Sequence, residues 1–190
     1  MARWEPDARQ RLVAAALDLF TEQGYDDTTV AQIADRAGLT KSTFFRHFPD
    51  KREVLVAGQD TLCRLLAEGI AAAPESATPL EAVGAALEAA ATAFTPERRQ
   101  LAPRLQAVIA ANGELQERDA LKHVGLAKAM SDALQRRGLP DPAASLAAEL
   151  GVLALKQASA RWTDPANDRP LGDLARQSLQ ELRAASAALG

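Results

Sequence analysis

The sequence predicts an all-α protein, with an N-terminal three-helix domain that contains a helix-turn-helix and a larger C-terminal helical domain. Alanine is abundant and β-branched residues are scarce, which favours helix over strand. Apolar residues recur at three- and four-residue steps, and Gly or Pro interrupts each run. The 190 residues are 47% apolar and 25% charged, a length and composition typical of a globular protein with a sizeable core.

The first two helices follow from helical spacing and from their end signals. Gly24 is the expected end of the first helix, and Thr28 or Thr29 is the expected N-cap of the second. The second helix is short and ends at Gly38. In the first helix the residues at helical spacing are Leu12, Ala16, Leu19, Phe20 and Gln23. The inner side of the second is predicted to carry Val30, Ile33, Ala34 and Ala37.

The third helix is expected to begin after Thr40 and to end at Pro49. Two short helices joined by a tight glycine turn, after one longer helix, are typical of a helix-turn-helix unit. Phe44 and Phe48 are four residues apart and share a face, which we expect to pack with Leu39 against the apolar residues Leu19, Phe20 and Ile33.

The opposite face of this third helix carries Lys41, Ser42 and Phe45, with Arg46 above Ser42. In helix-turn-helix proteins, the N-terminal residues of the recognition helix enter the major groove of DNA. One face is therefore predicted to be core and the other to contact DNA.

The charge distribution supports a local nucleic-acid contact. The whole chain carries −3, which argues against a general nucleic-acid binder. Residues 36–52, however, contain five basic side chains and one acid, giving +4. This basic island suits localised phosphate contacts, although a solvated charge cluster would look the same from charge alone. Its cations are Arg36, Lys41, Arg46, Lys51 and Arg52.

Several other classes of protein are disfavoured. A single cysteine, Cys63, excludes an internal disulfide, and its expected role is that of a small core residue. His47 and His123 are the only histidines, and no catalytic or phosphate-binding motif occurs, so we expect no enzyme, metal site or cofactor. No apolar run has membrane-spanning length and no signal peptide is evident, which predicts a cytoplasmic protein.

The stretch TTVAQIADRAGLTKSTFFRHFPDKREVL, residues 28–55, resembles the DNA-binding signature of the tetracycline-repressor (TetR) family of transcriptional regulators. The similarity extends back through RLVAAALDLFTEQGY, residues 11–25. The resemblance implies a DNA-binding domain over residues 1–52 and a helical domain over residues 53–190. In this family the second domain binds a small effector and forms the homodimer, and repression is the usual mode.

The resemblance also implies which residues touch DNA. Base contacts are expected near Val30, Lys41 and Ser42. One position departs from the family, because Phe45 stands where the family usually has a tyrosine whose hydroxyl contacts a phosphate. Arg46 is expected to supply the lost contact. Phosphate contacts are expected near Thr29, Thr40, Thr43, Phe45, His47 and Lys51.

The rest of the chain reads as further helices. A long helix is expected from Asp50 to about Pro74, joining the two domains. Gly- or Pro-containing breaks then separate five more helices, predicted over residues 80–94, 96–111, 115–137, 142–162 and 171–189.

Two of these helices, 142–162 and 171–189, carry a dimerisation signal. The first is apolar on nearly all sides, so we expect it to be buried between its own domain and a partner chain. A helix at the centre of a monomer would show the same apolar pattern. The second carries a stripe suited to helix–helix packing. This stripe consists of Leu171, Ala175, Ser178, Leu182, Ala185 and Leu189.

The predicted function is a ligand-responsive regulator, a repressor that binds a palindromic double-stranded DNA operator as a homodimer. A small apolar or amphipathic effector is expected to release it, because few aromatic residues and much Ala and Leu would line the pocket. The C-terminal half is also faintly similar to TetR regulators that sense acyl chains or acyl-CoA. The alternative is a ligand-independent helical DNA-binding protein. A hydrogen-bonded core role is the alternative for His123, and a partner within the protein is the alternative for Gln157. The polar and flexible side chains predicted for the pocket are Arg104, Gln106, Asn112, His123, Met130 and Gln157.

Overall fold

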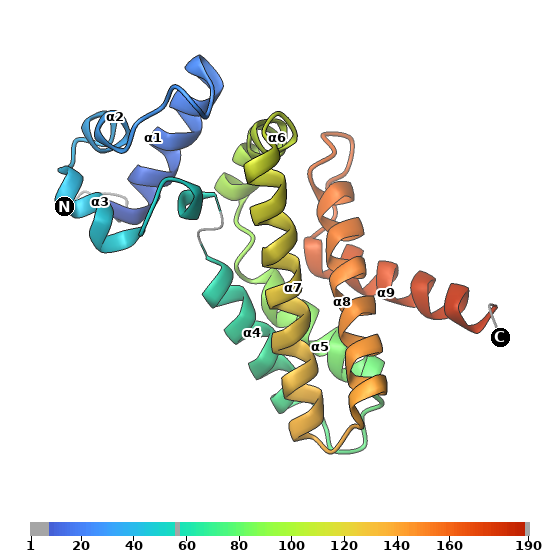
Figure 1. Cartoon of the computed structure of the whole chain (residues 1–190). Coiled ribbons are helices and arrows are strands. Elements are labelled where there is room, and N and C mark those ends of the chain that lie inside the picture. The colour runs from blue at the N-terminus through green and yellow to red at the C-terminus, as the bar shows by residue number, and fades with distance from the viewer. Residues whose placement is uncertain (1–7, 56–57, 189–190) are drawn as a thin grey trace, which may run out of the picture. The chain divides into compact units, whose positions relative to one another are not determined.

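The computed structural model describes residues 8–55 and 58–188, which form helices and turns and no strand (Figure 1). The all-α prediction is therefore confirmed. In chain order the helices are α1 (Ala8–Gln23), α2 (Val30–Arg36), α3 (Lys41–His47), a 3-10 turn (Arg52–Val54), α4 (Gln59–Ala72), α5 (Pro79–Ala91), α6 (Pro96–Ala110), α7 (Gly113–Arg136), α8 (Asp141–Trp162) and α9 (Leu171–Ala187).

The described residues group into two compact units. Residues 8–55 and 101–120 form the first unit, and residues 58–100 and 121–188 form the second. The first unit thus includes the end of α6 and the beginning of α7, which are remote in sequence from α1–α3. The predicted domain boundary between residues 52 and 53 stays a prediction.

The first unit has its own hydrophobic core. Side chains of α1, α2 and α3 form it together with Val108 of α6 and Leu115 of α7, both of which are buried. Leu101, Leu105 and Ile109 pack against the same cluster. The segment after residue 100 therefore stabilises the helix-turn-helix unit by burying apolar surface.

The predicted helix ends of this unit are confirmed. The Thr29 hydroxyl accepts the backbone N–H of Gln32 at the start of α2, and the Gln32 side chain accepts the Thr29 N–H in return. Thr40 caps α3 by accepting the Thr43 N–H at 3.1 Å. Gly24 and Gly38 have φ angles of 89° and 65°, which only glycine adopts without strain.

The expected continuous helix from Asp50 to Pro74 is wrong. The Asp50 carboxylate accepts the N–H groups of Arg52 and Glu53, at 2.8 and 3.2 Å, and so caps a single 3-10 turn. Gly58 then adopts a φ angle of 95°, and α4 begins only at Gln59. A left-handed residue cannot continue a right-handed helix.

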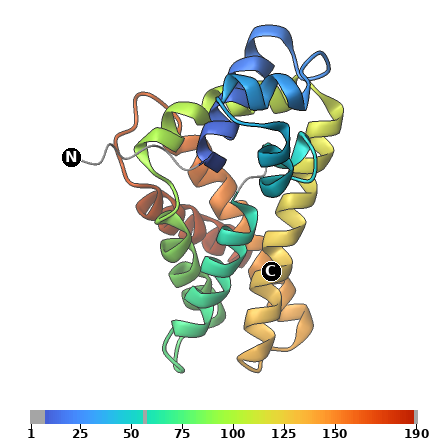
Figure 2. The ribbon, with the colours of Figure 1, turned by 90° about the vertical axis from the view of Figure 1, so that its left-hand side faces the viewer.

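In the second unit, α5 packs against α4, α8 and α9. The chain runs down α4 and back up α5, and likewise down the latter part of α7 and up α8 (Figure 2). Small residues allow close approach, since a Cβ added at Gly69 would lie 2.6 Å from the Ala86 Cα. The five predicted C-terminal helices are present as α5–α9, with described ends within three residues of the expected ones.

Candidate functional site

Helix α3 is anchored by the two phenylalanines predicted to face the core. Phe44 and Phe48 are 0% and 1% exposed, and their ring centroids lie 5.6 Å apart. Both belong to the cluster that contains Leu19, Phe20 and Ile33. The predicted inner face of α3 is therefore confirmed.

The outer face of α3 brings most of the predicted DNA-binding residues onto one surface. Lys41, Ser42, Phe45 and Arg46 are exposed, while the flanking Thr43 and His47 are partly buried. The Lys41 ammonium lies 6.0 Å from the centroid of the Phe45 ring. This face combines cations, hydroxyls and one aromatic ring, which can contact phosphates, base edges and thymine methyl groups.

Two further predicted contacts lie at the start of α2. Thr29 is exposed, and its hydroxyl belongs to the capping box with Gln32. Val30 is partly buried and packs against the core of the first unit. Both positions are therefore fixed by the N-cap geometry of α2.

The turn between α2 and α3 is held by a residue that sequence reasoning missed. Arg11 of α1 donates to the carbonyl oxygens of Ala37 and Gly38, at 2.5 and 3.4 Å. A Cβ at Gly38 would lie 2.9 Å from the Arg11 guanidinium. No local sequence pattern indicates this contact, because it joins residues 26 positions apart.

Two cations of the basic island are paired with carboxylates. The Arg36 guanidinium donates twice to Glu22, at 2.9 and 2.8 Å, and lowers the pKa of that carboxyl. Arg52 pairs with Asp50 at 2.7 Å and with Glu114 at 3.1 Å. Exposed pairs of this kind stabilise the fold little, but they neutralise the local charge.

Lys51, a third cation of the island, is engaged by the backbone. Its ammonium donates to the carbonyl oxygens of Tyr25, Thr28 and Asp26, at 2.7, 3.0 and 3.3 Å. The same nitrogen lies 4.1 Å from the centroid of the Tyr25 ring. Its predicted contact with phosphate stays a prediction, although the geometry directs its donors into the protein.

The remaining two cations of the island, Lys41 and Arg46, lie on α3. Within the part of the chain that the structure describes, no carboxylate lies within ion-pair distance of either. The two cations of the island with neither a carboxylate nor a backbone partner among the described residues therefore both lie on the outer face of α3.

Three of the predicted effector residues belong to the first unit. Arg104 donates to Asp18 at 2.8 Å, and Asn112 donates to Asp26 at 3.4 Å. Gln106 is exposed. Two of these three side chains therefore tie the α6–α7 segment to the helix-turn-helix unit, a contact that their residue types alone did not indicate.

The other three predicted effector residues belong to the second unit. Met130 is fully buried, and its sulfur would lie 3.1 Å from a Cβ added at Gly151, so it fills core space between α7 and α8. His123 and Gln157 are partly buried. The six residues are thus divided between the two units.

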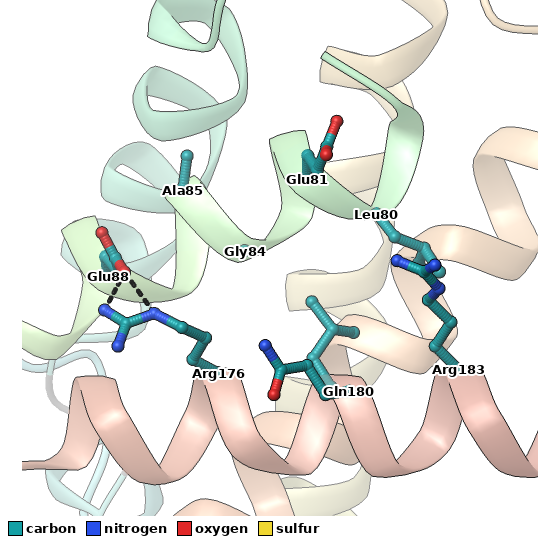
Figure 3. Close-up of a pocket in the computed structure, with 9 residues that line it drawn as sticks. Leu80, Glu81, Gly84, Ala85, Glu88, Arg176, Gln180 and Arg183 are labelled. Carbon is teal, nitrogen blue, oxygen red and sulfur yellow. Dashed lines mark hydrogen bonds and ion pairs between the residues drawn. The ribbon is translucent and has the colours of Figure 1, made fainter.

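A half-open groove with a volume of ≈ 400 Å³ lies between α5 and α9 (Figure 3). Most of the charged side chains at its rim already have partners within the chain. Arg176 pairs with Glu88, and Glu81 accepts hydrogen bonds from the N–H and hydroxyl groups of Thr78. None of the predicted effector residues lines it. The lining residues are Leu80, Glu81, Gly84, Ala85, Glu88, Arg176, Leu179, Gln180 and Arg183.

On the two predicted dimerisation helices, α8 and α9, some apolar residues are buried within the chain and others are exposed to solvent. On α8, Leu146 and Leu153 are 60% and 42% exposed, with the partly buried Leu150 between them on the same face. The predicted stripe of α9 needs correction, because its first members are buried within the chain, where α9 packs on α8 and α5. These buried members are Leu171, Ala175 and Ser178.

The later members of the α9 stripe are more accessible. Leu182 is partly buried and Ala185 is exposed, whereas Leu189 lies outside the described residues. Among the described residues of these two helices, the accessible apolar surface therefore lies on this second half of the stripe and on the leucines of α8.

Over residues 8–55 and 58–188, no helix is long and apolar enough to cross a membrane. In the same residues, no group of three or more His, Cys, Asp or Glu side chains could hold a metal ion. Cys63 is partly buried, packs against the core of the second unit, and has a pKa raised by burial. Its environment is that of a packing residue.

Comparison with known sequences finds matches in the N-terminal part of the chain. The family described as "Bacterial regulatory proteins, tetR family" matches residues 12–57. The chain is 37% identical over 81 residues to the transcriptional regulator TcmR of Streptomyces glaucescens, covering 43% of this chain and 36% of TcmR. It is 47% identical over 51 residues to SrpR of Pseudomonas putida, covering 27% and 24%. The matches thus span well under half of these relatives.

Solved structures share the fold over almost the whole chain. FadR of Bacillus subtilis, in complex with stearoyl-CoA, has a TM-score of 0.59 and 18% identity, covering 91% of this chain and 96% of FadR. SmeT, in complex with triclosan, has a TM-score of 0.57 and 22% identity, covering 94% and 90%. At these identities the likeness establishes the fold alone.

Proposed function

Because this chain belongs to the tetR family of bacterial regulatory proteins, we propose that it is a transcriptional repressor that binds a palindromic DNA operator as a homodimer. The observation that carries this proposal is the two-faced α3. Its buried Phe44 and Phe48 fix the helix, and its exposed face holds the unpaired Lys41 and Arg46. We place its action in the cytoplasm, where a bacterial operator lies.

The DNA contacts of this proposal come from two places, the exposed face of α3 and the start of α2. Lys41, Ser42 and Val30 would contact bases. The other side chains would contact phosphates and so set the register of the protein on the duplex. These phosphate-contacting residues are Thr29, Thr40, Thr43, Phe45, Arg46 and His47.

A homodimer would place two copies of α3 in successive major grooves, about 34–36 Å apart. The exposed Leu146 and Leu153 of α8 support this assembly, because with the partly buried Leu150 they form an apolar stripe along one face of a helix predicted to meet a partner chain. The exposed second half of α9 would complete the interface.

We further propose that a small apolar or amphipathic effector binds the helical second unit and releases the operator. The likeness of the fold to FadR with stearoyl-CoA and to SmeT with triclosan supports this. Dodecanoate and triclosan are suitable probes. If neither these nor a wider set of amphiphiles raises the melting temperature or releases DNA, the ligand-independent alternative is favoured.

The relatives are transcriptional regulators, which supports a regulator over an enzyme. The test of the proposal is selection of bound duplexes from random DNA by the full chain, with light scattering of the free protein. Enrichment of an inverted repeat and a dimeric mass would support it. A strict monomer at micromolar concentration, or no enrichment, would contradict it.

A further inference from the structure

We infer that Lys51 is a positioning residue that fixes the entry of α2 from inside the protein, and that it does not bind phosphate. The DNA readout of this inference rests on the function proposed above. The inference itself rests on the contacts of one ammonium group.

The Lys51 ammonium has three N–H donors, and three carbonyl oxygens surround it. These belong to Tyr25, Asp26 and Thr28, at 2.7, 3.3 and 3.0 Å. An ammonium group has no further donor to offer. A phosphate contact would therefore require Lys51 to leave at least one of these carbonyls.

The face of the Tyr25 ring provides a fourth contact, 4.1 Å from the ammonium. Tyr25 is itself buried, and its ring centroid lies 5.1 Å from that of Phe20 in the core. A cation over an aromatic face is attracted electrostatically, more strongly when partly desolvated. The aromatic partner of Lys51 is thus held rigidly by the core.

The three carbonyls lie in the connection between α1 and α2, where the chain has no regular helix to satisfy them. Thr28 directly precedes Thr29, the N-cap of α2, and Val30, its first residue. Lys51 follows the buried Phe48 by three residues. Its side chain therefore ties the segment that leaves α3 to the segment that enters α2.

This tie would hold Thr29 and Val30 at a fixed place relative to α3. Both sets of DNA contacts must fit the same duplex, so loosening the tie should weaken binding without removing a contact to DNA. A phosphate-binding lysine behaves differently, because its loss reduces the number of counterions released.

The test uses the full chain with Lys51→Met, which removes the ammonium, and Lys51→Gln, which keeps amide donors without charge. Arg46→Met is the matched control, because it removes an exposed cation of α3 that has no carboxylate partner among the described residues. Two readouts are needed: deuterium exchange of residues 25–30, and the salt dependence of affinity for a duplex selected by the unmodified chain.

We expect Lys51→Met to speed exchange over residues 25–30 and to weaken binding about tenfold at every salt concentration, a loss comparable to the entropy cost of ordering one backbone residue on binding. The slope of log affinity against log salt should stay unchanged, and Lys51→Gln should restore part of the protection. Arg46→Met should instead reduce the slope by about 0.9 per protomer and leave the exchange unaltered.

A slope reduced by Lys51→Met as much as by Arg46→Met would overturn the inference and assign Lys51 to phosphate. Unchanged exchange in both folded Lys51 variants would overturn it as well, since no tie would then exist. If the unmodified chain selects no duplex, the proposed function fails, but the exchange experiment still tests the tie.

Discussion

Phe44 and Phe45 are neighbours whose rings meet edge to face at 5.5 Å, yet Phe44 is fully buried and Phe45 is 49% exposed. The boundary between core and solvent therefore runs between two consecutive residues of α3. A half-exposed phenylalanine ring costs solubility, which is understandable if its exposed side contacts DNA.

Phe45→Tyr should strengthen DNA binding without changing the selected sequence. The added hydroxyl would point outward and could donate to a phosphate oxygen, worth about 0.5–1.5 kcal/mol. Phosphate contacts carry no base information. Affinity measurements on the selected duplex and on a scrambled one check this.

Phe48→Tyr is the matched control, because Phe48 is 1% exposed and a hydroxyl there would be buried without an evident partner. It should lower the melting temperature. If Phe48→Tyr is silent and Phe45→Tyr unfolds the first unit, the assignment of the DNA face is wrong.

Leu146→Glu combined with Leu153→Glu should convert the proposed dimer into a monomer. The two side chains are exposed in the single chain, so the substitutions should not disturb its core, but they would place charges in the proposed interface. Light scattering measures the mass of the protein in solution and so distinguishes a dimer from a monomer. Leu121→Glu, on the 52% exposed Leu121 of α7, is the control and should leave a dimer. A dimer that survives the double substitution would remove α8 from the interface.

Gly84→Ala should stabilise the protein by about 0.5–1 kcal/mol, because glycine in a helix interior is unfavourable. A Cβ there would meet only the Leu179 side chain, at 3.8 Å, an ordinary contact in the groove of Figure 3. Urea unfolding measures the change.

Gly69→Ala is the contrasting variant, since its Cβ would lie 2.6 Å from the Ala86 Cα and must displace backbone. It should destabilise the second unit. Destabilisation by Gly84→Ala would show that the groove is filled or rearranged in solution.

Asp50 should contribute a pH-dependent part of the stability. Its hydrogen bond with Arg52, aided by the backbone N–H groups that it caps, lowers the pKa of its carboxyl below the ordinary 3.8. A lowered folded-state pKa means that the stabilisation is complete above 3.8 and is lost as pH falls through the folded value. Unfolding free energies of the unmodified chain and Asp50→Asn should therefore differ more at pH 7 than near pH 2. An equal difference at both pH values would refute this.

Local features of the fold were predictable because their causes are local. Gly24, Gly38, Thr29 and Thr40 end or begin helices through their own backbone freedom or hydroxyl groups. The spacing of Phe44 and Phe48 predicted which face is buried. Gly58 was the missed signal, since its left-handed conformation interrupts what looked like one helix from Asp50 to Pro74.

Partners distant in sequence were not predictable. The sequence predicted Arg36 and Lys51 to be available charges of the basic island. In the structure Arg36 pairs with Glu22, which is 14 positions away. The Lys51 ammonium donates to the carbonyl oxygens of Tyr25 and Thr28, up to 26 positions away. Arg104, proposed for the pocket, pairs with Asp18 at a separation of 86 positions. Residue type indicates that a polar side chain needs a partner, but only the fold selects that partner.

The central claim is that DNA meets the outer face of α3 and that Arg46, not Arg36, supplies its charge. The salt dependence of operator affinity for Arg46→Ala and Arg36→Ala tests it most directly. We predict that Arg46→Ala reduces the slope of log affinity against log salt by about 2 per dimer, or about 0.9 per protomer, and that Arg36→Ala leaves the slope unchanged. An unchanged slope for Arg46→Ala, with a reduced one for Arg36→Ala, would contradict the account.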